Sequence, residues 1–197
     1  MVRTLERPTI PTDEFTARWR RVQTLMAERD LDLVVAYADD RATFGAAHAR
    51  WLADFPVHFE PCCVLVPRTG DPVMLVGPES DEYALVRGRI PDVRVLREFT
   101  HPDEDYPYSV IVGLGEVLAD IGLDPRASRT VGLAGRGLIA ADTLRALEAA
   151  LPESDWVDIE DAMCDLRARK SPAEIAVGRE AYRIADIGIE AAVETIR

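Results

Sequence analysis

The chain has 197 residues, 48% of them hydrophobic, and a formal net charge of −12. This length fits one domain or one domain with an appended element, and the apolar content suffices for a sizeable core. An acidic surface repels phosphate backbones and anionic headgroups, so we expect neither nucleic acid nor a membrane as partner. No run of about 18 apolar residues predicts a membrane-spanning helix.

The N-terminus and the cysteines point to a cytoplasmic protein. Residues 1–12 carry arginines and prolines but no apolar stretch, which predicts a flexible arm and not a signal peptide. Cys62, Cys63 and Cys164 give an odd count, and two of them are adjacent, so a disulfide framework is disfavoured. We therefore expect free thiols in a reducing compartment.

An amphipathic helix is predicted over residues 13–29. Its apolar residues recur at helical spacing: Phe15, Trp19, Val22, Leu25 and Met26. Thr12 is the expected N-cap, and Asp13 and Glu14 lie in the first turn, where the helix dipole favours acidic groups. Residues 31–37 are short, apolar and branched, which predicts a buried strand.

The next segment holds the clearest hairpin. Residues 38–48 are polar or small, with room for a short helix, and residues 50–55 are expected to form a short strand. Two apolar runs follow, at 62–66 and 73–76. The loop between them contains prolines and Gly70, which tolerates a positive φ, so these runs should pair.

Helices and strands then alternate. The expected elements are a helix at 79–89, a strand at 93–99, a polar loop at 101–108, a helix at 110–121 ending at Gly122, a strand at 130–134, a helix at 138–151 and a strand at 156–159. This order predicts an α/β fold, a three-layer sandwich with helices flanking a mixed sheet of five or six strands.

The last segment begins a helix with strong start signals. After a short helix at 161–169, Ser171 is the N-cap, Pro172 takes the first helical position and Glu174 completes a capping box. The apolar positions of this helix need cover, among them Ile184, Ile187 and Ala191. We expect residues 169–197 to be a linker and the first helix of a further domain; the alternative is a helix packed back on its own sheet.

Catalytic motifs are sparse. The run from His58 to Cys63 (HFEPCC) resembles parts of zinc-deaminase motifs, but its spacing is wrong and adjacent thiols on a strand point to opposite faces. Gly135-Arg136-Gly137 follows a strand but lacks a third glycine and a P-loop lysine, which favours a plain turn. There is no G-x-S-x-G nucleophile motif, so we expect no catalytic residue and no metal or cofactor in this chain.

A few polar residues remain weak candidates for ligand contact. His48, His58 and His101 form no pair at metal-binding spacing. Asp39 and Asp40 follow the first strand, where carboxylates can line an α/β ligand crevice, although they more often form turns or caps.

Several segments together resemble the creatinase/prolidase family, in its amino-terminal domain. Residues 50–55 read RWLADF, near the family's Y-L-T-G-F; residues 63–76 read CVLVPRTGDPVMLV, near L-x-V-P-x-x-G-x-P-x-L-L-V. Residues 166–175 read LRARKSPAEI and match the junction L-R-x-x-K-S-P-x-E-I. The resemblance covers residues 13–197 and implies the ribonuclease H-like motif of this domain over 13–168.

The resemblance also implies a catalytic domain that these 197 residues do not contain. In the family that domain binds two divalent metals, commonly manganese or cobalt, through two aspartates, a histidine and two glutamates, whereas creatinase itself works without metal. None of those ligand segments occurs here, so no metal ligand is assigned to any residue.

For this domain the resemblance implies supporting roles. The family uses it for homodimer contacts, and in several members one of its loops reaches the neighbouring subunit's active site. The matching loop is residues 50–60, and the substrate-loop candidates are Phe55, His58, Phe59 and Glu60. Ala53-Asp54 replaces the usual T-G, which leaves the loop shape open.

The preferred hypothesis is therefore a non-catalytic N-terminal domain of a Xaa-Pro dipeptidase- or aminopeptidase-like metallohydrolase. Its parent would act on Xaa-Pro peptides, with creatine-like or other C–N substrates as options. The alternatives are a stand-alone small-molecule-binding or oligomerisation module, and a complete enzyme with an unnoticed site, against which the missing nucleophile and metal clusters argue.

Overall fold

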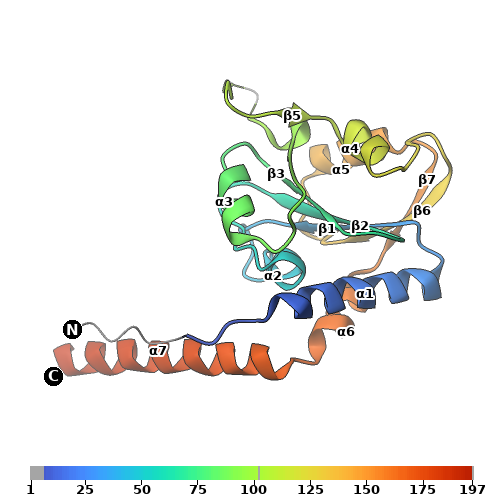
Figure 1. Cartoon of the computed structure of the whole chain (residues 1–197). Helices are drawn as coiled ribbons and strands as arrows, with labels where there is room; N and C mark the ends of the chain where they lie inside the picture. Colours follow the sequence, from blue (N-terminus) through green and yellow to red (C-terminus); the bar gives the residue numbers. More distant parts are fainter. Residues whose placement is uncertain (1–6, 102, 197) are drawn as a thin grey trace.

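A seven-stranded mixed sheet forms the centre of the computed structural model, which describes residues 7–101 and 103–196 (Figure 1). The strand order is β5-β4-β3-β2-β1-β6-β7. The strands are β1 (Leu33–Ala38), β2 (Cys62–Pro67), β3 (Val73–Val76), β4 (Val93–Leu96), β5 (Ile111–Val112), β6 (Arg129–Ala134) and β7 (Ser154–Asp158).

The strand β2 runs opposite to the six other strands of the sheet. This strand runs antiparallel to both neighbours, with Leu33 of β1 opposite Pro67 and Cys62 opposite Val76 of β3. All other pairs are parallel, including β1 with β6 and β6 with β7. The carboxyl ends of β1, β6 and β7 therefore meet at one edge of the sheet.

Helices cover both faces. They are α1 (Thr12–Arg29), α2 (Ala47–Ala53), α3 (Asp81–Arg87), α4 (Leu114–Asp120), α5 (Ala141–Ala150), α6 (Glu160–Ala168) and α7 (Pro172–Ile196), with a 3₁₀ turn at Arg97–Phe99. Residues of α1, α2 and α6 share one apolar core with one sheet face, and α4 and α5 share a second core with the other (Figure 1). Adjacent Cys62 and Cys63 belong to different cores, as strand alternation predicts.

The predicted three-layer α/β class is confirmed, but the sheet has seven strands and not five or six. The additional strand is β5, at the start of the segment predicted as a helix over 110–121. Gly113 has an extended backbone (φ −86°, ψ 155°), so the helix begins only at Leu114. It ends before Gly122, whose φ of +77° fits the predicted stop.

Two local predictions are wrong. Residues 50–55 do not form a strand, because Ala47–Ala53 is the helix α2, which buries Trp51 and Leu52 against the first core. Thr12 is the first residue of α1 and not its N-cap; Pro11 holds the cap position, without a side-chain hydrogen bond. Asp13 and Glu14 do lie in the first turn.

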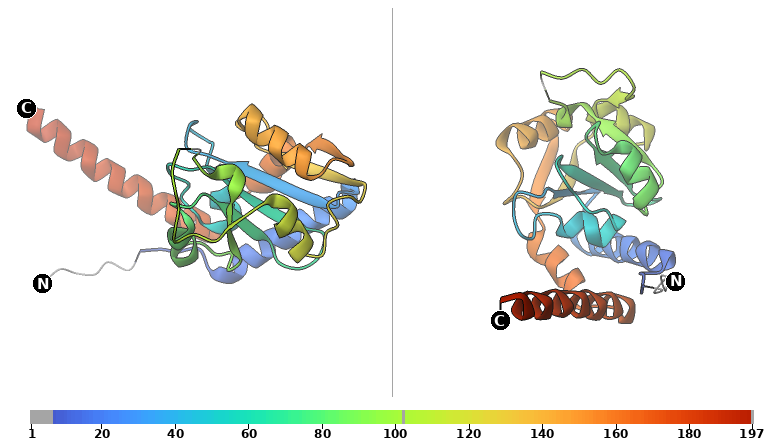
Figure 2. Two further views of the ribbon diagram at one scale, coloured as in Figure 1. Left: turned by 90° about the horizontal axis from the view of Figure 1, so that it is seen from above. Right: turned by 90° about the vertical axis from the view of Figure 1, so that its left-hand side faces the viewer.

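The terminal helix α7 projects away from the domain (Figure 2). None of its side chains within Pro172–Ile196 is buried. The predicted arm falls partly on residues 1–6, outside the described residues; residues 7–11 lack regular structure, and Ile10 packs against the first core. Among the residues described, no helix is both long and apolar enough to cross a membrane.

Candidate functional site

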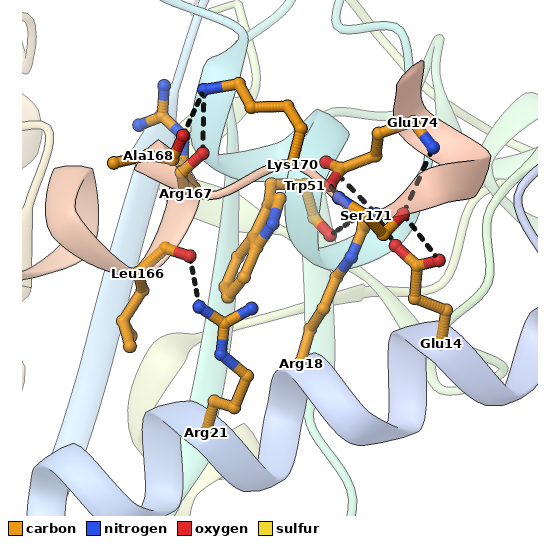
Figure 3. Close-up of polar contacts among 10 residues, drawn as sticks. All are labelled: Glu14, Arg18, Arg21, Trp51, Leu166, Arg167, Ala168, Lys170, Ser171 and Glu174. Atoms are coloured by element: carbon orange, nitrogen blue, oxygen red, sulfur yellow. Dashed lines mark hydrogen bonds and ion pairs between the residues drawn. The ribbon is translucent and has the colours of Figure 1, made fainter. Parts of the chain in front are cut away.

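The junction between the domain and α7 is organised around one buried cation, Arg18 of α1. Its side chain is only 3% exposed, although it lies on the apolar face of the helix beside Phe15 and Trp19. The guanidinium carbon lies 4.7 Å from the Phe15 ring centroid and 5.5 Å from that of Trp51. Its Nη1 donates a hydrogen bond to the Trp51 carbonyl at 2.8 Å (Figure 3).

Two carboxylates from distant segments share this guanidinium. Glu14, one turn earlier in α1, pairs with Nη2, and the Oε1 of Glu174 in α7 lies 3.2 Å from the same nitrogen. The two acidic side chains are 20% and 18% exposed. The buried Arg18 cation is thus paired with both acids, which ties the first turn of α7 to α1.

The predicted capping box at the start of α7 is confirmed. The Glu174 amide donates to Ser171 Oγ at 3.1 Å, and the Ser171 amide donates to Glu174 Oε2 at 2.8 Å. Ser171 Oγ also donates to Glu14 Oε2 at 2.9 Å. The cap and the Arg18 cluster are therefore one connected network (Figure 3).

The end of α6 is held by two further cations. Arg21 donates to the Leu166 carbonyl, and its guanidinium carbon lies 5.3 Å from the Trp51 ring centroid. Lys170 Nζ donates to the carbonyls of Arg167 and Ala168 at 2.8 and 3.2 Å. These bonds satisfy carbonyls that the helix end leaves without intrahelical partners.

This junction fixes the direction in which the chain leaves the domain. It offers cation–carboxylate pairing and caps, but no nucleophile–base pair. Over residues 7–101 and 103–196, no group of three or more His, Cys, Asp or Glu is placed to hold a metal ion. The contacts at the junction position α7 relative to α1 and α6.

The four substrate-loop candidates are split between the core and the surface. Phe55 is 1% exposed and its ring lies 5.7 Å from that of Tyr83. Glu60 is 2% exposed; its carboxylate accepts the Glu79 amide at 3.1 Å, and burial raises its pKa. Gly77 is required beside it, because a Cβ there would lie 2.3 Å from the Glu60 carboxyl carbon.

His58 and Phe59 form an exposed tip on the same loop. Phe59 is 67% exposed, and its φ of +72° is a conformation that non-glycine residues rarely adopt. Asp40, just after β1, holds this tip: its Oδ2 accepts the Phe59 amide at 2.9 Å and lies 3.2 Å from His58 Nδ1. The Phe59 amide also lowers the pKa of Asp40.

Sequence reasoning missed the cluster of Glu14 and Arg18. One signal was present, because an arginine at position 18 interrupts the apolar face of the first helix, with a glutamate four residues earlier. The partner Glu174 was identified only as a capping residue. Its pairing with Arg18 depends on the path of α6, which the local pattern does not give.

The comparisons agree with this architecture. The family model of the creatinase/prolidase N-terminal domain matches residues 18–169, which include the whole sheet and end just before α7. The chain belongs to this family. No curated protein matches it by sequence.

Solved structures show the same creatinase/prolidase fold at low sequence identity. The prolidase from Pyrococcus horikoshii OT3 aligns with a TM-score of 0.63 and 14% identity, covering 90% of this chain and 42% of that one. The Xaa-Pro dipeptidase from Bacillus anthracis aligns at 0.62 and 16%, covering 93% and 44%. This chain thus spans less than half the length of either.

A third match is itself a domain. The N-terminal domain of the cytoplasmic peptidase PepQ from Mycobacterium tuberculosis H37Rv aligns with a TM-score of 0.52 and 18% identity, covering 76% of this chain and 98% of that one. The shared fold therefore corresponds to an N-terminal domain of peptidase-like proteins.

Proposed function

We propose that this chain is the non-catalytic N-terminal domain of a Xaa-Pro dipeptidase- or aminopeptidase-like metallohydrolase, and that it supports dimerisation and substrate access. The single observation that carries the proposal is the creatinase/prolidase N-terminal family match over residues 18–169, which ends just before α7. Relatives with this fold include proteins about twice as long.

The apolar surface of α7 supports a following catalytic domain. Ile184, Ile187 and Val193 are 46%, 52% and 43% exposed, although a helix with this pattern normally packs against a neighbour. We propose that these side chains pack against the catalytic domain that α7 would enter. Residues 169–197 then act as the linker and first helix of that domain, and residues 13–168 as the N-terminal domain proper.

The exposed tip supports a role in substrate access. His58 and Phe59 stand on a strained turn held by Asp40, as expected for side chains that are presented to a partner surface. We propose that the tip enters the substrate cleft of the neighbouring subunit in a homodimer. Phe55 and Glu60 would hold the loop from inside without touching substrate.

The parent enzyme would use two divalent metals, manganese or cobalt, bound in the catalytic domain. The family resemblance assigns the metal ligands to that catalytic domain, and we propose no metal ligand among residues 1–197. We propose a cytoplasmic enzyme that acts on Xaa-Pro peptides, with a creatine-like or other C–N substrate as the second substrate class.

The test is a pair of substitutions in the full-length protein encoded by the gene. Phe59→Ala should raise KM for an Ala-Pro dipeptide at least fivefold while the content of bound metal and the dimer mass in light scattering stay unchanged. Tyr108→Ala is the matched control, because Tyr108 is an aromatic side chain that is 99% exposed and lies outside residues 50–60, so its loss should leave KM unchanged. Identical kinetics of the two variants would rule out the role of the tip, and a monomeric parent would rule out its action in a homodimer.

A further inference from the structure

The parallel strands β1, β6 and β7 have their carboxyl ends at the same edge of the sheet. The segments that follow them lie on different faces of the sheet. After β1 the chain enters α2 on the first face, and after β6 it enters α5 on the opposite face. The strand β7 ends beside β6 and leads into α6 on the first face. In open α/β sheets, ligands bind outside the carboxyl ends of strands at such a switch point, because the diverging loops leave a crevice between them.

The crevice is present in this molecule. A cavity of about 520 Å³ opens at the carboxyl ends of β1, β6 and β7, and all three connections contribute to its wall. The lining residues are Ala42, Thr43, Phe44, Gly45, His48, Gly135, Gly137, Leu138 and Glu160. The wall is largely apolar, and Phe44 is 81% exposed at it.

The loop that forms one side of this crevice is anchored. Asp39 is 2% exposed; its Oδ1 accepts the Arg41 amide at 3.0 Å, and its own amide donates to the Gly45 carbonyl at 3.3 Å. Only glycine fits at position 45, because a Cβ would lie 2.4 Å from the Asp39 carbonyl oxygen. The wall is therefore formed before any ligand arrives, which lowers the entropic cost of binding.

The one charged group of the lining is Glu160, at the start of α6. Its Oε2 accepts the Gly135 amide at 2.7 Å, and both oxygens lie 3.1 Å from His48 Nε2. On the other side of the ring, Arg167 Nη1 lies 3.2 Å from His48 Nδ1. Since arginine can only donate, Nδ1 accepts, and a neutral His48 carries its proton on Nε2 and donates it to Glu160.

This network leaves a negative charge facing the cavity. Burial opposes ionisation of Glu160, but the Gly135 amide and His48 outweigh it and lower its pKa. Burial lowers the pKa of His48, which stays uncharged at neutral pH. The Glu160 side chain remains 42% exposed; besides the Gly135 amide and His48, the Cys164 thiol donates to its Oε1 at 3.6 Å. Three donors therefore occupy its roughly four lone-pair sites, which leaves one for a ligand.

We propose that this crevice binds a small organic cation, a protonated amine on a compact apolar body, with Glu160 as the counter-ion. The ammonium group would donate to the free lone pair of Glu160, while the apolar body packs on Ala42, Phe44 and Leu138. None of the nine lining residues is a lysine or arginine that would compete with the ligand. The proposal does not depend on the proposed peptidase role, because every residue involved belongs to this chain.

The test uses the 197-residue chain and 2-phenylethylammonium, titrated by calorimetry and by ¹⁵N–¹H NMR. We expect saturable binding, with shift changes at residues 42–45 and 135–138. The neutral analogue 2-phenylethanol and the anion 3-phenylpropanoate should each bind at least tenfold more weakly. Equal affinity for all three probes, or shift changes confined to other surfaces, would overturn the proposal.

Matched variants separate the carboxylate from general surface charge. Glu160→Gln should weaken binding at least tenfold, whereas Asp161→Asn removes the same charge from the next, exposed residue and should change affinity less than twofold. Phe44→Ala removes an apolar side chain from the cavity wall. Because Phe44 is 81% exposed, the substitution should leave the core intact, and it should weaken binding at least threefold. Unchanged affinity in both Glu160→Gln and Phe44→Ala, or an equal loss in Asp161→Asn, would contradict the assignment.

Discussion

At the scale of single residues, Arg18 shows how a buried charge can fix the relation between two segments. Arg18→Met keeps most of the side-chain volume but leaves Glu14 and Glu174 facing each other without a counter-ion. We expect a loss of about 2–3 kcal/mol in the free energy of unfolding, at the lower end for a broken buried pair because both acids are partly exposed. Urea unfolding followed by circular dichroism measures it.

The control for this substitution is Arg20→Met on the exposed face of the same helix. It should change the free energy of unfolding by less than about 0.5 kcal/mol. A triple variant with Gln at 14 and 174 and Met at 18 should recover part of the loss, since no unpaired charge remains. Equal effects of Arg18→Met and Arg20→Met would show that the cluster contributes no stability.

A second residue-scale prediction concerns pH and His48. Burial lowers the pKa of His48 despite the attraction of Glu160, so the unfolded chain takes up a proton at a higher pH than the folded chain. The contribution of neutral His48 to the free energy of unfolding is fully present above about pH 7. It falls as the pH drops below about 6.5, the pKa of histidine in the unfolded chain. The slope from this one group is at most about 1.4 kcal/mol per pH unit.

His48→Gln should flatten this dependence between pH 7 and pH 5, as measured by urea unfolding at several pH values. His101→Gln, at an exposed loop position, should leave the dependence as it is in the unmodified chain. If both variants lose stability with falling pH as steeply as the unmodified chain, His48 is not the group responsible.

At the scale of elements, the start of α7 depends on its capping box. Ser171→Ala removes the acceptor of the Glu174 amide and the donor to Glu14, which should destabilise the first turn by about 1 kcal/mol. Amide hydrogen exchange in the first turn of α7 should accelerate about fivefold, with the sheet unaffected, because no side chain of α7 is buried. Ser171→Thr should retain the cap, and unchanged exchange in Ser171→Ala would contradict this account.

The elements also show how far the sequence predicts the fold. The hairpin of β2 and β3, the sandwich class and the capping box follow from local patterns, and the structure confirms them. The segment 50–55 was misassigned because a short buried helix and a short buried strand are both simply apolar. The pairing of His48 with Glu160 spans 112 residues, so only the sheet order brings the two together.

At the scale of the whole molecule, the domain and the projecting helix should be energetically separable. A chain ending at Gly178 keeps Arg18, Ser171 and Glu174 and should unfold with a free energy within about 0.5 kcal/mol of the full chain, because residues 179–196 bury no side chain. A chain ending at Arg169 keeps Glu14 but loses Glu174, the second acidic partner of Arg18, together with the cap residue Ser171, and should be less stable by about 2 kcal/mol. Thermal and urea unfolding of both would show it, and equal stability of the two truncations would contradict the role of the junction.

We propose that this domain supports a catalytic domain and performs no hydrolysis itself. The most direct measurement is hydrolysis of Gly-Pro and Ala-Pro in the presence of Mn²⁺, by this 197-residue chain and by the full-length protein encoded by the gene. We predict proline release by the longer protein and none by the chain alone. Hydrolysis by the chain alone would contradict the claim, and a longer protein inactive on both dipeptides would move its substrate away from proline peptides.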